Sequence, residues 1–389
     1  MKKIATIFNY KKFPPRPLMS AIFDTQERNV EFLPLYMPDV ITIRKVRENI
    51  DKIKSILQTN TVIIDDVLSH VLEIIKPVHA KQMQISNFPP KNYEIYESRL
   101  PLDNTIPESI DDTKKLLLKK IISMPKKPAP WMKTKADAGI VYAYLTHRGL
   151  MYGPRPVFPH YDTRVLSGRS RTTNFNIQGT TQEDLIKHPD PDRTHMICFD
   201  WVSADVRMAG YLSLDKFINH SFHESDPYTE ITKQLNMEDI NRDDCKLEVL
   251  RSIYKVDLSS PLLDMMPGLK AWLSQKYSDF DDNYNFKTIL GMPVPKDTLR
   301  SSVNGIIQGS VAEALQSAMS KISRIDIDCI LTEIHDSLII SSSESDVPKI
   351  IDKIVPIMMK PFDNTTISMP VKVSIGKRWK NWKEYKVFR

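Results

Sequence analysis

Residues 199–207 read Phe-Asp-Trp-Val-Ser-Ala-Asp-Val-Arg and follow the apolar run 195–199. A short apolar run that is bounded by polar residues predicts a buried strand, so Asp200 is expected at a strand end. Strand ends of this kind are where α/β sheets gather their reactive side chains. The segment 200–214 is therefore predicted to run from a strand into a helix, with Asp200 as a candidate reactive group.

A second segment, 325–340, contains Glu-Ile-His-Asp-Ser at positions 333–337. It predicts two strands around a polar turn, with Asp336 at the bend. Two aspartates from distant parts of a chain can converge on a pair of divalent metal ions. An aspartate after an apolar run is by itself more often a helix cap or a turn residue, so the interpretation needs further patterns.

Two further patterns lie between these aspartates in the sequence, and a third, at 167–178, precedes Asp200. Arg242, Lys246, Leu250 and Tyr254 are spaced by four residues and share one side of a predicted helix. A basic stripe can reach a triphosphate, although two cations at this spacing normally lie on a solvated face. The helix predicted at 298–323, capped by Asp297, carries a polar stripe every fourth residue. That stripe consists of Arg300, Asn304 and Gln308.

Taken together, these segments resemble the motifs of the family A DNA polymerases, the polymerase I family. Residues 200–207 resemble motif A, the 242–254 stripe resembles motif B, and 333–337 resemble motif C. Ser-Gly-Arg-Ser-Arg-Thr-Thr-Asn-Phe-Asn-Ile-Gln at 167–178 resembles the family's Thr-Gly-Arg-Leu-Ser-Ser…Asn-Leu-Gln segment. Residues 371–376 with Trp379 resemble its last strand. The resemblance covers roughly Asp162 to the C-terminus and leaves out residues 1 to about 110.

The resemblance implies a fold as well as an activity. It implies an α/β (α+β) right-hand polymerase with a palm, fingers and a reduced thumb, plus a small N-terminal α/β domain. The expected divisions are an N-terminal domain (1–105), a reduced thumb-like region and linker (106–165), the first part of the palm (166–215), the fingers (216–297) and the second part of the palm (298–389). The short form is typical of a phage, plasmid or mobile element.

The activity implied is template-directed DNA synthesis, in which dNTPs are added to a primer 3′ end during DNA replication. Asp200, Asp336 and the carbonyl of Trp201 would hold two Mg²⁺ ions, for which Mn²⁺ can substitute, because hard cations take oxygen ligands. Lys246 would act as general acid toward the leaving pyrophosphate. The nucleotide site would comprise Arg242, Lys246, Leu250, Tyr254 and Asp205. The contacts to primer–template DNA would come from Arg169, Asn176, Gln178, Arg300, Asn304, Gln308 and His335.

Three positions depart from the family pattern. Asp205 stands where glutamate is usual, Leu250 where phenylalanine or tyrosine is usual, and Ser337 where glutamate is common. His-Asp-Ser also occurs in the related single-subunit phage RNA polymerases, so an RNA polymerase-like enzyme or one with low sugar discrimination is an alternative. A second alternative is a non-catalytic DNA-binding component of a replisome, although both aspartates are present.

The N-terminal region has two interpretations, a vestigial exonuclease-like domain and an unrelated α/β appendage. Strands are predicted at 21–24, 30–36 and 61–64, and a short helix at 67–75. Family proofreading domains begin with a strand that carries Asp-x-Glu. Asp24 and Glu27 are one residue too far apart to share a strand face, so no 3′→5′ exonuclease activity is expected.

Composition limits the remaining possibilities. The 389 residues carry a formal net charge of +6, which suits a polyanionic partner without proving one. The three cysteines, Cys198, Cys245 and Cys329, lack metal-ligand spacing and are expected as reduced thiols of a cytoplasmic protein, in a bacterial host if the gene is carried by a phage or plasmid. No apolar run is long enough to span a bilayer. A processivity factor, primase or helicase is a possible further partner.

Overall fold

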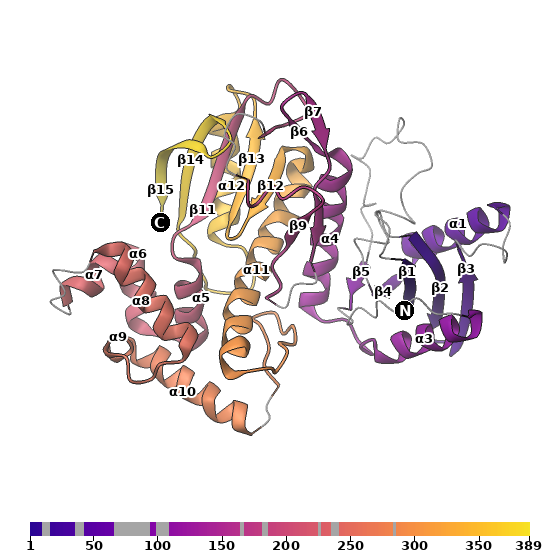
Figure 1. The fold of residues 1–389 in the computed structure, drawn as a ribbon, viewed down its shortest axis with the longest axis horizontal. Helices are drawn as coiled ribbons and strands as arrows, with labels where there is room; N and C mark the ends of the chain where they lie inside the picture. The colour runs from indigo at the N-terminus through magenta and orange to yellow at the C-terminus, as the bar shows by residue number, and fades with distance from the viewer. Residues whose placement is uncertain are drawn as a thin grey trace. The chain divides into compact units, whose positions relative to one another are not determined.

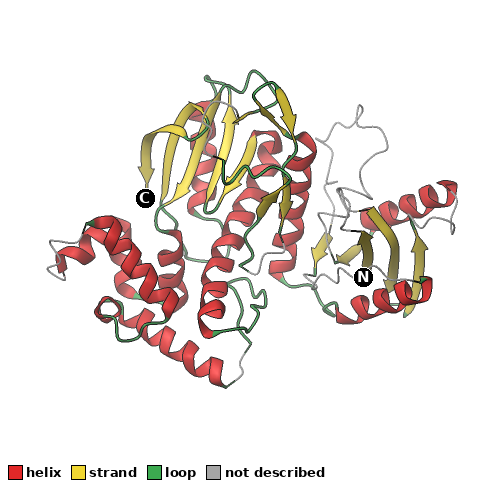
Figure 2. Cartoon of the chain, in the orientation of Figure 1, coloured by secondary structure: helices red, strands yellow, loops and turns green. Residues whose placement is uncertain are grey.

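A computed structural model describes residues 1–9, 16–35, 43–65, 94–98, 109–163, 167–180, 186–224, 227–234, 241–282 and 285–389. The helix predicted at 67–75 lies outside these residues. The chain divides into two compact units, 1–148 and 149–389. Each unit has its own sheet with helices packed against it (Figures 1 and 2). No described helix is both long enough and apolar enough to cross a membrane.

The first unit contains a five-stranded mixed sheet. Its spatial order is β3-β2-β1-β4-β5. The strands are β1 (Lys2–Asn9), β2 (Arg16–Asp24), β3 (Asn29–Pro34), β4 (Thr61–Ile64) and β5 (Glu94–Glu97). β1 is antiparallel to β2 and parallel to β4. The strands predicted at 21–24, 30–36 and 61–64 thus correspond to β2, β3 and β4, and the first strand, β1, was not anticipated.

Helices lie on both faces of this sheet (Figure 1). They are α1 (Ile43–Thr59), α3 (Ile110–Ser123) and α4 (Pro130–Arg148). Ile4 of β1 packs in one buried cluster with Ile53 of α1 and Ile140 of α4. Side chains alternate between the faces of a sheet, so Lys3 and Asp65 point the other way. There Lys3 Nζ donates to Met124 O at 3.1 Å, and Lys120 Nζ of α3 donates to Asp65 Oδ2 at 2.9 Å.

The helix that we assigned to a reduced thumb, α3, packs instead on the N-terminal sheet. Leu117 and Ile121 are buried, and the helix contacts β1 and β2. Part of its basic charge is paired, since Lys115 lies 3.3 Å from Asp112. The apolar face of the helix needs a surface to cover it, and the sheet provides one. The division between units therefore falls after Arg148, and the predicted boundaries at 105 and 165 do not coincide with it.

The aspartate of the suspected exonuclease pattern is the last residue of β2, and its carboxylate caps the turn that follows. Asp24 Oδ1 accepts hydrogen bonds from the amides of Gln26, at 2.9 Å, and Glu27, at 3.4 Å, and Lys2 lies 3.4 Å from the carboxylate. These amide bonds hold the pKa of Asp24 below its usual value. The strand that opens the sheet is β1, and its sequence Lys-Lys-Ile-Ala-Thr-Ile-Phe-Asn contains no carboxylate.

The second unit is built on a five-stranded antiparallel sheet, in the order β12-β13-β11-β14-β15. The strands are β11 (His195–Trp201), β12 (Ile330–Ile334), β13 (Ser337–Ser342), β14 (Val371–Arg378) and β15 (Asn381–Phe388). Shorter strands form two small sheets beside it, β6 (Leu150–Tyr152), β7 (Arg155–Val157) and β10 (Ile186–Lys187) in one, and β8 (His160–Asp162) and β9 (Arg171–Thr173) in the other.

Its helices are α5 (Ala204–Ser213), α6 (Lys216–Glu224), α7 (Pro227–Gln234), α8 (Arg242–Lys255), α9 (Pro261–Asp264), α10 (Pro267–Asp281), α11 (Leu299–Asp326) and α12 (Val347–Met359). α11 begins one residue later than predicted. Thr298, not Asp297, is its N-cap, because the Thr298 hydroxyl accepts from the Ser301 amide in a capping box. α11 continues through residues 325 and 326, which were predicted as strand.

Candidate active site

Asp200 and Asp336 come together through strand pairing. β11 pairs with β13 in a register that sets Asp200 opposite Ser337, the residue after Asp336. Asp200 is the single position of β11 that is not fully buried. Asp336 lies in the turn between β12 and β13, as the sequence predicted. The two carboxylates, 136 positions apart in the sequence, therefore lie together at the same end of neighbouring strands.

Two residues beside the carboxylates have unusual backbone conformations. Ser203, which precedes α5, has φ 58°, and His335 has φ 56°. Left-handed backbone is uncommon outside glycine and is held in place by neighbouring contacts. Arg207 Nε donates to Val202 O at 2.7 Å, and Ser337 Oγ donates to Ile334 O at 2.8 Å. These bonds fix the two turns that present Asp200 and Asp336.

The electrostatics of the pair favour a cation. Burial and the nearby Asp336 carboxylate raise the pKa of Asp200 to about 6. Burial and Asp205 raise the pKa of Asp336. Two partly desolvated carboxylates repel each other, and a divalent cation between them would relieve that repulsion. The oxygen donors suit Mg²⁺ or Mn²⁺, so the residues present fit the predicted metal. The role of the Trp201 carbonyl stays a prediction.

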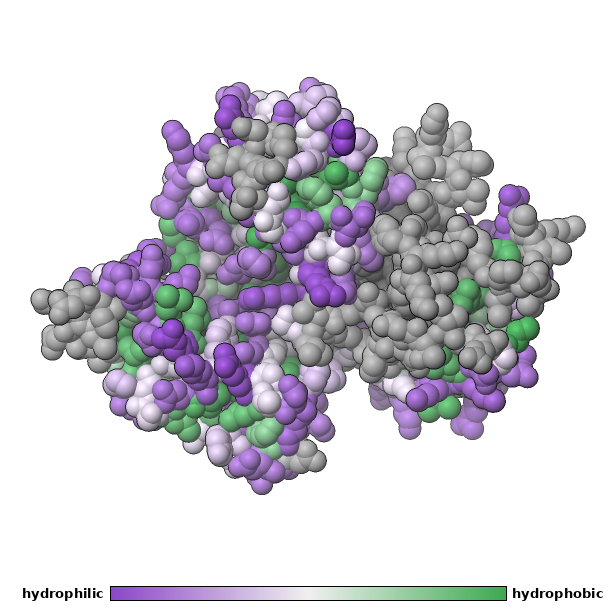
Figure 3. Space-filling model, viewed as in Figure 1, coloured by the Kyte–Doolittle hydropathy of each residue, from purple (hydrophilic) through white to green (hydrophobic). Residues whose placement is uncertain are grey.

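A cavity of about 560 Å³ opens beside Asp200 and Asp336. Three segments of the second unit line most of it, namely 200–206, α8 and β15. In Figure 3, hydrophilic residues form a band across the middle of this unit. Arg242, Lys246 and Leu250 of α8 line this cavity, and their role in nucleotide binding stays a prediction. Its full lining is Asp200, Trp201, Val202, Ser203, Ala204, Asp205, Val206, Tyr228, Arg242, Lys246, Leu250, Asp336, Lys372, Glu384, Val387 and Arg389.

Asp205 and Tyr254, both assigned to the predicted nucleotide site, are in contact. The Tyr254 hydroxyl donates a short hydrogen bond to Asp205 Oδ2. Arg169 Nη2 lies 3.3 Å from Asp205 Oδ1. Gln308 is hydrogen-bonded to Tyr254 as well. Burial and the adjacent Asp205 raise the pKa of Tyr254, so its hydroxyl stays protonated as a donor. These four side chains form one network, which we call the Asp205 network.

The 167–178 segment is anchored so that Arg169 reaches this network. Ser170 Oγ donates to the buried Glu333 carboxylate, and Gln316 Nε2 donates to Gly168 O at 3.1 Å. Gln178 is committed to the same segment, since its Oε1 accepts from the Thr172 amide at 3.1 Å. Asn176 Oδ1 accepts from the Gly179 amide at 3.0 Å. Gln178 and Asn176 thus hold the shape of the segment. The sequence predicted that they contact DNA directly, and we propose instead that they position Arg169.

The central turns of α11 are buried except at the polar stripe. Between Ser302 and Gln316, Asn304 and Gln308 are the two residues that are not buried. Arg300 is exposed one turn earlier, and His335 is exposed beside Asp336. Among the described residues, Asn304 Oδ1 and Arg169 Nε are two of seven buried side-chain atoms without a hydrogen-bond partner. Buried polar atoms are usually paired, and these two belong to residues for which the sequence predicts a contact with DNA.

Comparison with solved structures decides the fold. The chain is similar to the POL domain of Pol1 from M. smegmatis, solved in complex with DNA primer-template and dNTP. The TM-score is 0.57 at 11% sequence identity, and the match covers 97% of this chain and 95% of that one. The fold is that of a polymerase domain. No protein-family model and no curated protein sequence matches the chain.

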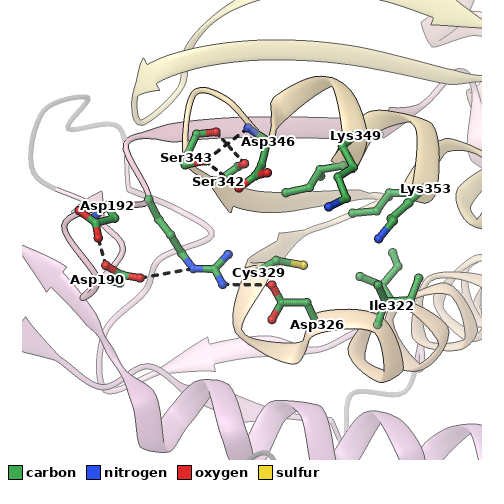
Figure 4. A pocket seen from close by; sticks show the side chains of 14 residues that line it. Asp190, Asp192, Ile322, Asp326, Cys329, Ser342, Ser343, Asp346, Lys349 and Lys353 are labelled. Carbon is green, nitrogen blue, oxygen red and sulfur yellow. Dashed lines mark hydrogen bonds and ion pairs between the residues drawn. The ribbon is translucent and has the colours of Figure 1, made fainter.

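A second cavity, of about 380 Å³, lies between α11, β13 and α12, away from the two aspartates (Figure 4). Beside it, His188, Asp190 and Asp328 offer ligand atoms within 4.8 Å of one another, the spacing of a metal site. Arg193, however, lies 3.8 Å from Asp190 and 3.4 Å from Asp328. The guanidinium already supplies the positive charge, so this cluster is the weaker candidate for a metal.

Two residues of the site escaped the sequence analysis. Lys372 lines the main cavity from β14, and Glu333 anchors the Arg169 segment. Lys372 stands between buried Val371 and Val373, a pattern that predicts a strand but does not show which strand pairs with it. Only the register of β14 against β11 places it beside Asp200. The position of Glu333 within Glu-Ile-His-Asp-Ser was visible, but its burial was not.

Proposed function

We propose that the chain is a DNA-directed DNA polymerase of the polymerase I family, which extends a primer 3′ end with dNTPs. The observation that carries the proposal is the meeting of Asp200 and Asp336 in one cavity with Arg242 and Lys246 of α8. Carboxylates and cations facing one another across a cavity suit a metal-bound triphosphate. The similarity to a polymerase domain supports the same conclusion.

Asp200 and Asp336 would hold the Mg²⁺ ions, which supply charge neutralisation at the reacting phosphate. Arg242 would bind the terminal phosphates and Lys246 would protonate the leaving pyrophosphate. Both side chains are exposed to the cavity from α8. Asn241 caps this helix, with its Oδ1 accepting from the Asp243 and Asp244 amides. The cap fixes the helix start and so the direction of its basic stripe.

Primer–template DNA would lie against Arg169, Asn304 and Gln308. Minor-groove acceptors are nearly the same for every base pair, so donors placed there sense pair shape without reading sequence. Asp205, held by Tyr254, would occupy the space beside the sugar of the incoming nucleotide and select deoxyribose. In this proposal the β11–β14 sheet with α5, α11 and α12 is the palm, and α6–α10 are the fingers.

Primer extension on a defined template in Mg²⁺ tests this function. The full chain is supplied with dNTPs or with rNTPs. Preferential extension with dNTPs supports a DNA polymerase. Equal use of the two sugars favours the RNA polymerase-like alternative suggested by Ser337. Binding of primer–template without extension under any nucleotide favours the non-catalytic alternative.

A further inference from the structure

Lys372 occupies a position that no motif marks. β14 pairs with β11 in a register that sets Lys372 directly opposite Asp200. Residues opposite each other on neighbouring strands leave the sheet on the same face, with Cβ atoms about 5 Å apart. β11 lies between β13 and β14 (Figure 1). Asp200 is therefore flanked by the turn that carries Asp336 on one side and by Lys372 on the other.

The ammonium group of Lys372 is not used to hold the fold. Lys372 is half-buried and makes no hydrogen bond or ion pair with another described residue. Lys377, on the same strand, instead lies 3.5 Å from Glu344. The charge of Lys372 nevertheless reaches Asp200, because it partly offsets the rise in the pKa of that carboxyl. A half-buried lysine that lines a cavity and makes no hydrogen bond or ion pair with a described residue suggests an anionic ligand.

A second lysine, Lys246, also acts on Asp200, from a helix instead of a strand. It belongs to α8, lines the same cavity and also lowers the pKa of Asp200. The described residues that line the cavity include four carboxylates, Asp200, Asp205, Asp336 and Glu384, and four cations, Arg242, Lys246, Lys372 and Arg389. The lining is thus balanced before any ligand enters. A metal-bound triphosphate, whose own charges also nearly cancel, suits such a cavity.

We propose that Lys372 is a phosphate-binding residue of the active site, which contacts the triphosphate of the incoming nucleotide from the sheet side, opposite Lys246. This rests on the proposed polymerase function. An ammonium is a compact charge on a flexible stem, and it binds phosphate oxygens without a fixed orientation. Because it also repels Mg²⁺, its loss has opposite effects on the two ligands. Triphosphate binding weakens, whereas metal binding is unchanged or strengthened.

The test uses the full chain on a primer–template whose primer ends in a dideoxynucleotide, so that binding is measured without reaction. Lys372→Met removes the charge and keeps the length, and Lys372→Arg restores the charge. Lys377→Met is the matched control on the same strand. We expect Lys372→Met to raise the dNTP dissociation constant by at least about 10-fold, the loss of one charge-assisted contact. We expect Lys372→Arg and Lys377→Met to stay within about threefold of the unmodified protein.

Two further readouts separate a phosphate contact from a structural role. Inhibition by pyrophosphate should weaken in Lys372→Met. Primer–template affinity should stay unchanged, and the Mg²⁺ concentration that the protein requires should not rise. A dNTP dissociation constant within twofold of the unmodified protein would overturn the inference. So would equal losses in Lys372→Met and Lys372→Arg accompanied by lower melting temperatures. Absence of extension by the unmodified chain would instead count against the polymerase proposal itself.

Discussion

At the scale of single residues, Asp205 reaches Tyr254 with a short side chain. It is one methylene shorter than the glutamate that the family A polymerases usually carry in the segment that residues 200–207 resemble, yet its carboxylate accepts from the Tyr254 hydroxyl. Arg169 binds the second carboxylate oxygen at 3.3 Å. Because Tyr254 and Arg169 each hold one carboxylate oxygen, the position of the carboxylate is fixed. The carboxylate can therefore limit the space for a 2′-hydroxyl although the side chain is short. This arrangement supports Asp205 as the residue that selects the sugar.

Asp205→Ala should raise rNTP incorporation relative to dNTP incorporation by about 10- to 100-fold, the range that one steric contact provides. Asp205→Glu should lower rNTP use or, by crowding Tyr254, reduce incorporation of both nucleotides. Single-nucleotide insertion kinetics with matched dNTP and rNTP measure both effects. An unchanged ratio in Asp205→Ala would assign the selection to another residue.

Asp200 should be a residue that reduces stability in the absence of metal. Its pKa in the fold is about 6, against an ordinary value of 3.8. The folded state therefore binds more protons between these values, and its stability falls as pH rises from about 4 to 6. Because Asp200 is only half-buried, Asp200→Asn should stabilise the metal-free protein at pH 7.5 by about 1–2 kcal/mol.

Thermal unfolding measures whether Asp200→Asn raises or lowers the stability of the metal-free protein. Metal-free Asp200→Asn should melt at a higher temperature than the unmodified protein at pH 7.5, and the difference should shrink toward pH 4. Mg²⁺ or Mn²⁺ should raise the melting temperature of the unmodified protein and not that of the variant. A variant that melts lower at pH 7.5 would show that the carboxylate is a structural partner.

At the scale of elements, the sequence indicated β2, β3 and β4 of the first unit and the motif-bearing elements of the second. The β11–α5 unit, the β12–β13 hairpin and α11 were predicted because each has clear periodicity and polar ends. The sequence did not predict β1, and it assigned α3 to the wrong neighbours. Lys114, Lys115, Lys119 and Lys120 look alike in sequence, and only the fold shows that Lys120 is buried against Asp65. Local sequence patterns do not show which distant elements pack together.

Lys120 is therefore expected to be a structural residue of the first unit. Asp65 has a side-chain exposure of 3%, and Lys120 bonds both its carboxylate and the Thr6 carbonyl. Lys120→Ala would remove the ion pair between Lys120 and this buried carboxylate, at a cost of about 3–5 kcal/mol. Lys119→Ala, one position away and exposed, is the control and should change little. Denaturant unfolding of the full chain measures both. Equal effects of the two substitutions would show that the Lys120–Asp65 pair is not what stabilises the unit.

At the scale of the whole molecule, the two units have different expected roles. The second unit holds the candidate active site. In the first unit, Asp24 caps the turn after β2 and Asp65 is paired with Lys120, and the described residues there hold no group of three metal-ligating side chains. We predict no 3′→5′ exonuclease activity. Shortening of a 5′-labelled mismatched primer in Mg²⁺ by the unmodified chain, lost in Asp24→Ala, would contradict this prediction.

The central claim is that Asp200 and Asp336 hold the metal ions of nucleotidyl transfer. The most direct measurement is primer extension by Asp200→Asn and Asp336→Asn, with primer–template affinity measured on the same preparations. Asp352→Asn, an exposed carboxylate on α12, is the control. Loss of extension in both variants, with DNA affinity within about threefold of the unmodified chain because phosphate contacts lie elsewhere, is the predicted result. Near-normal extension by either variant would contradict the account.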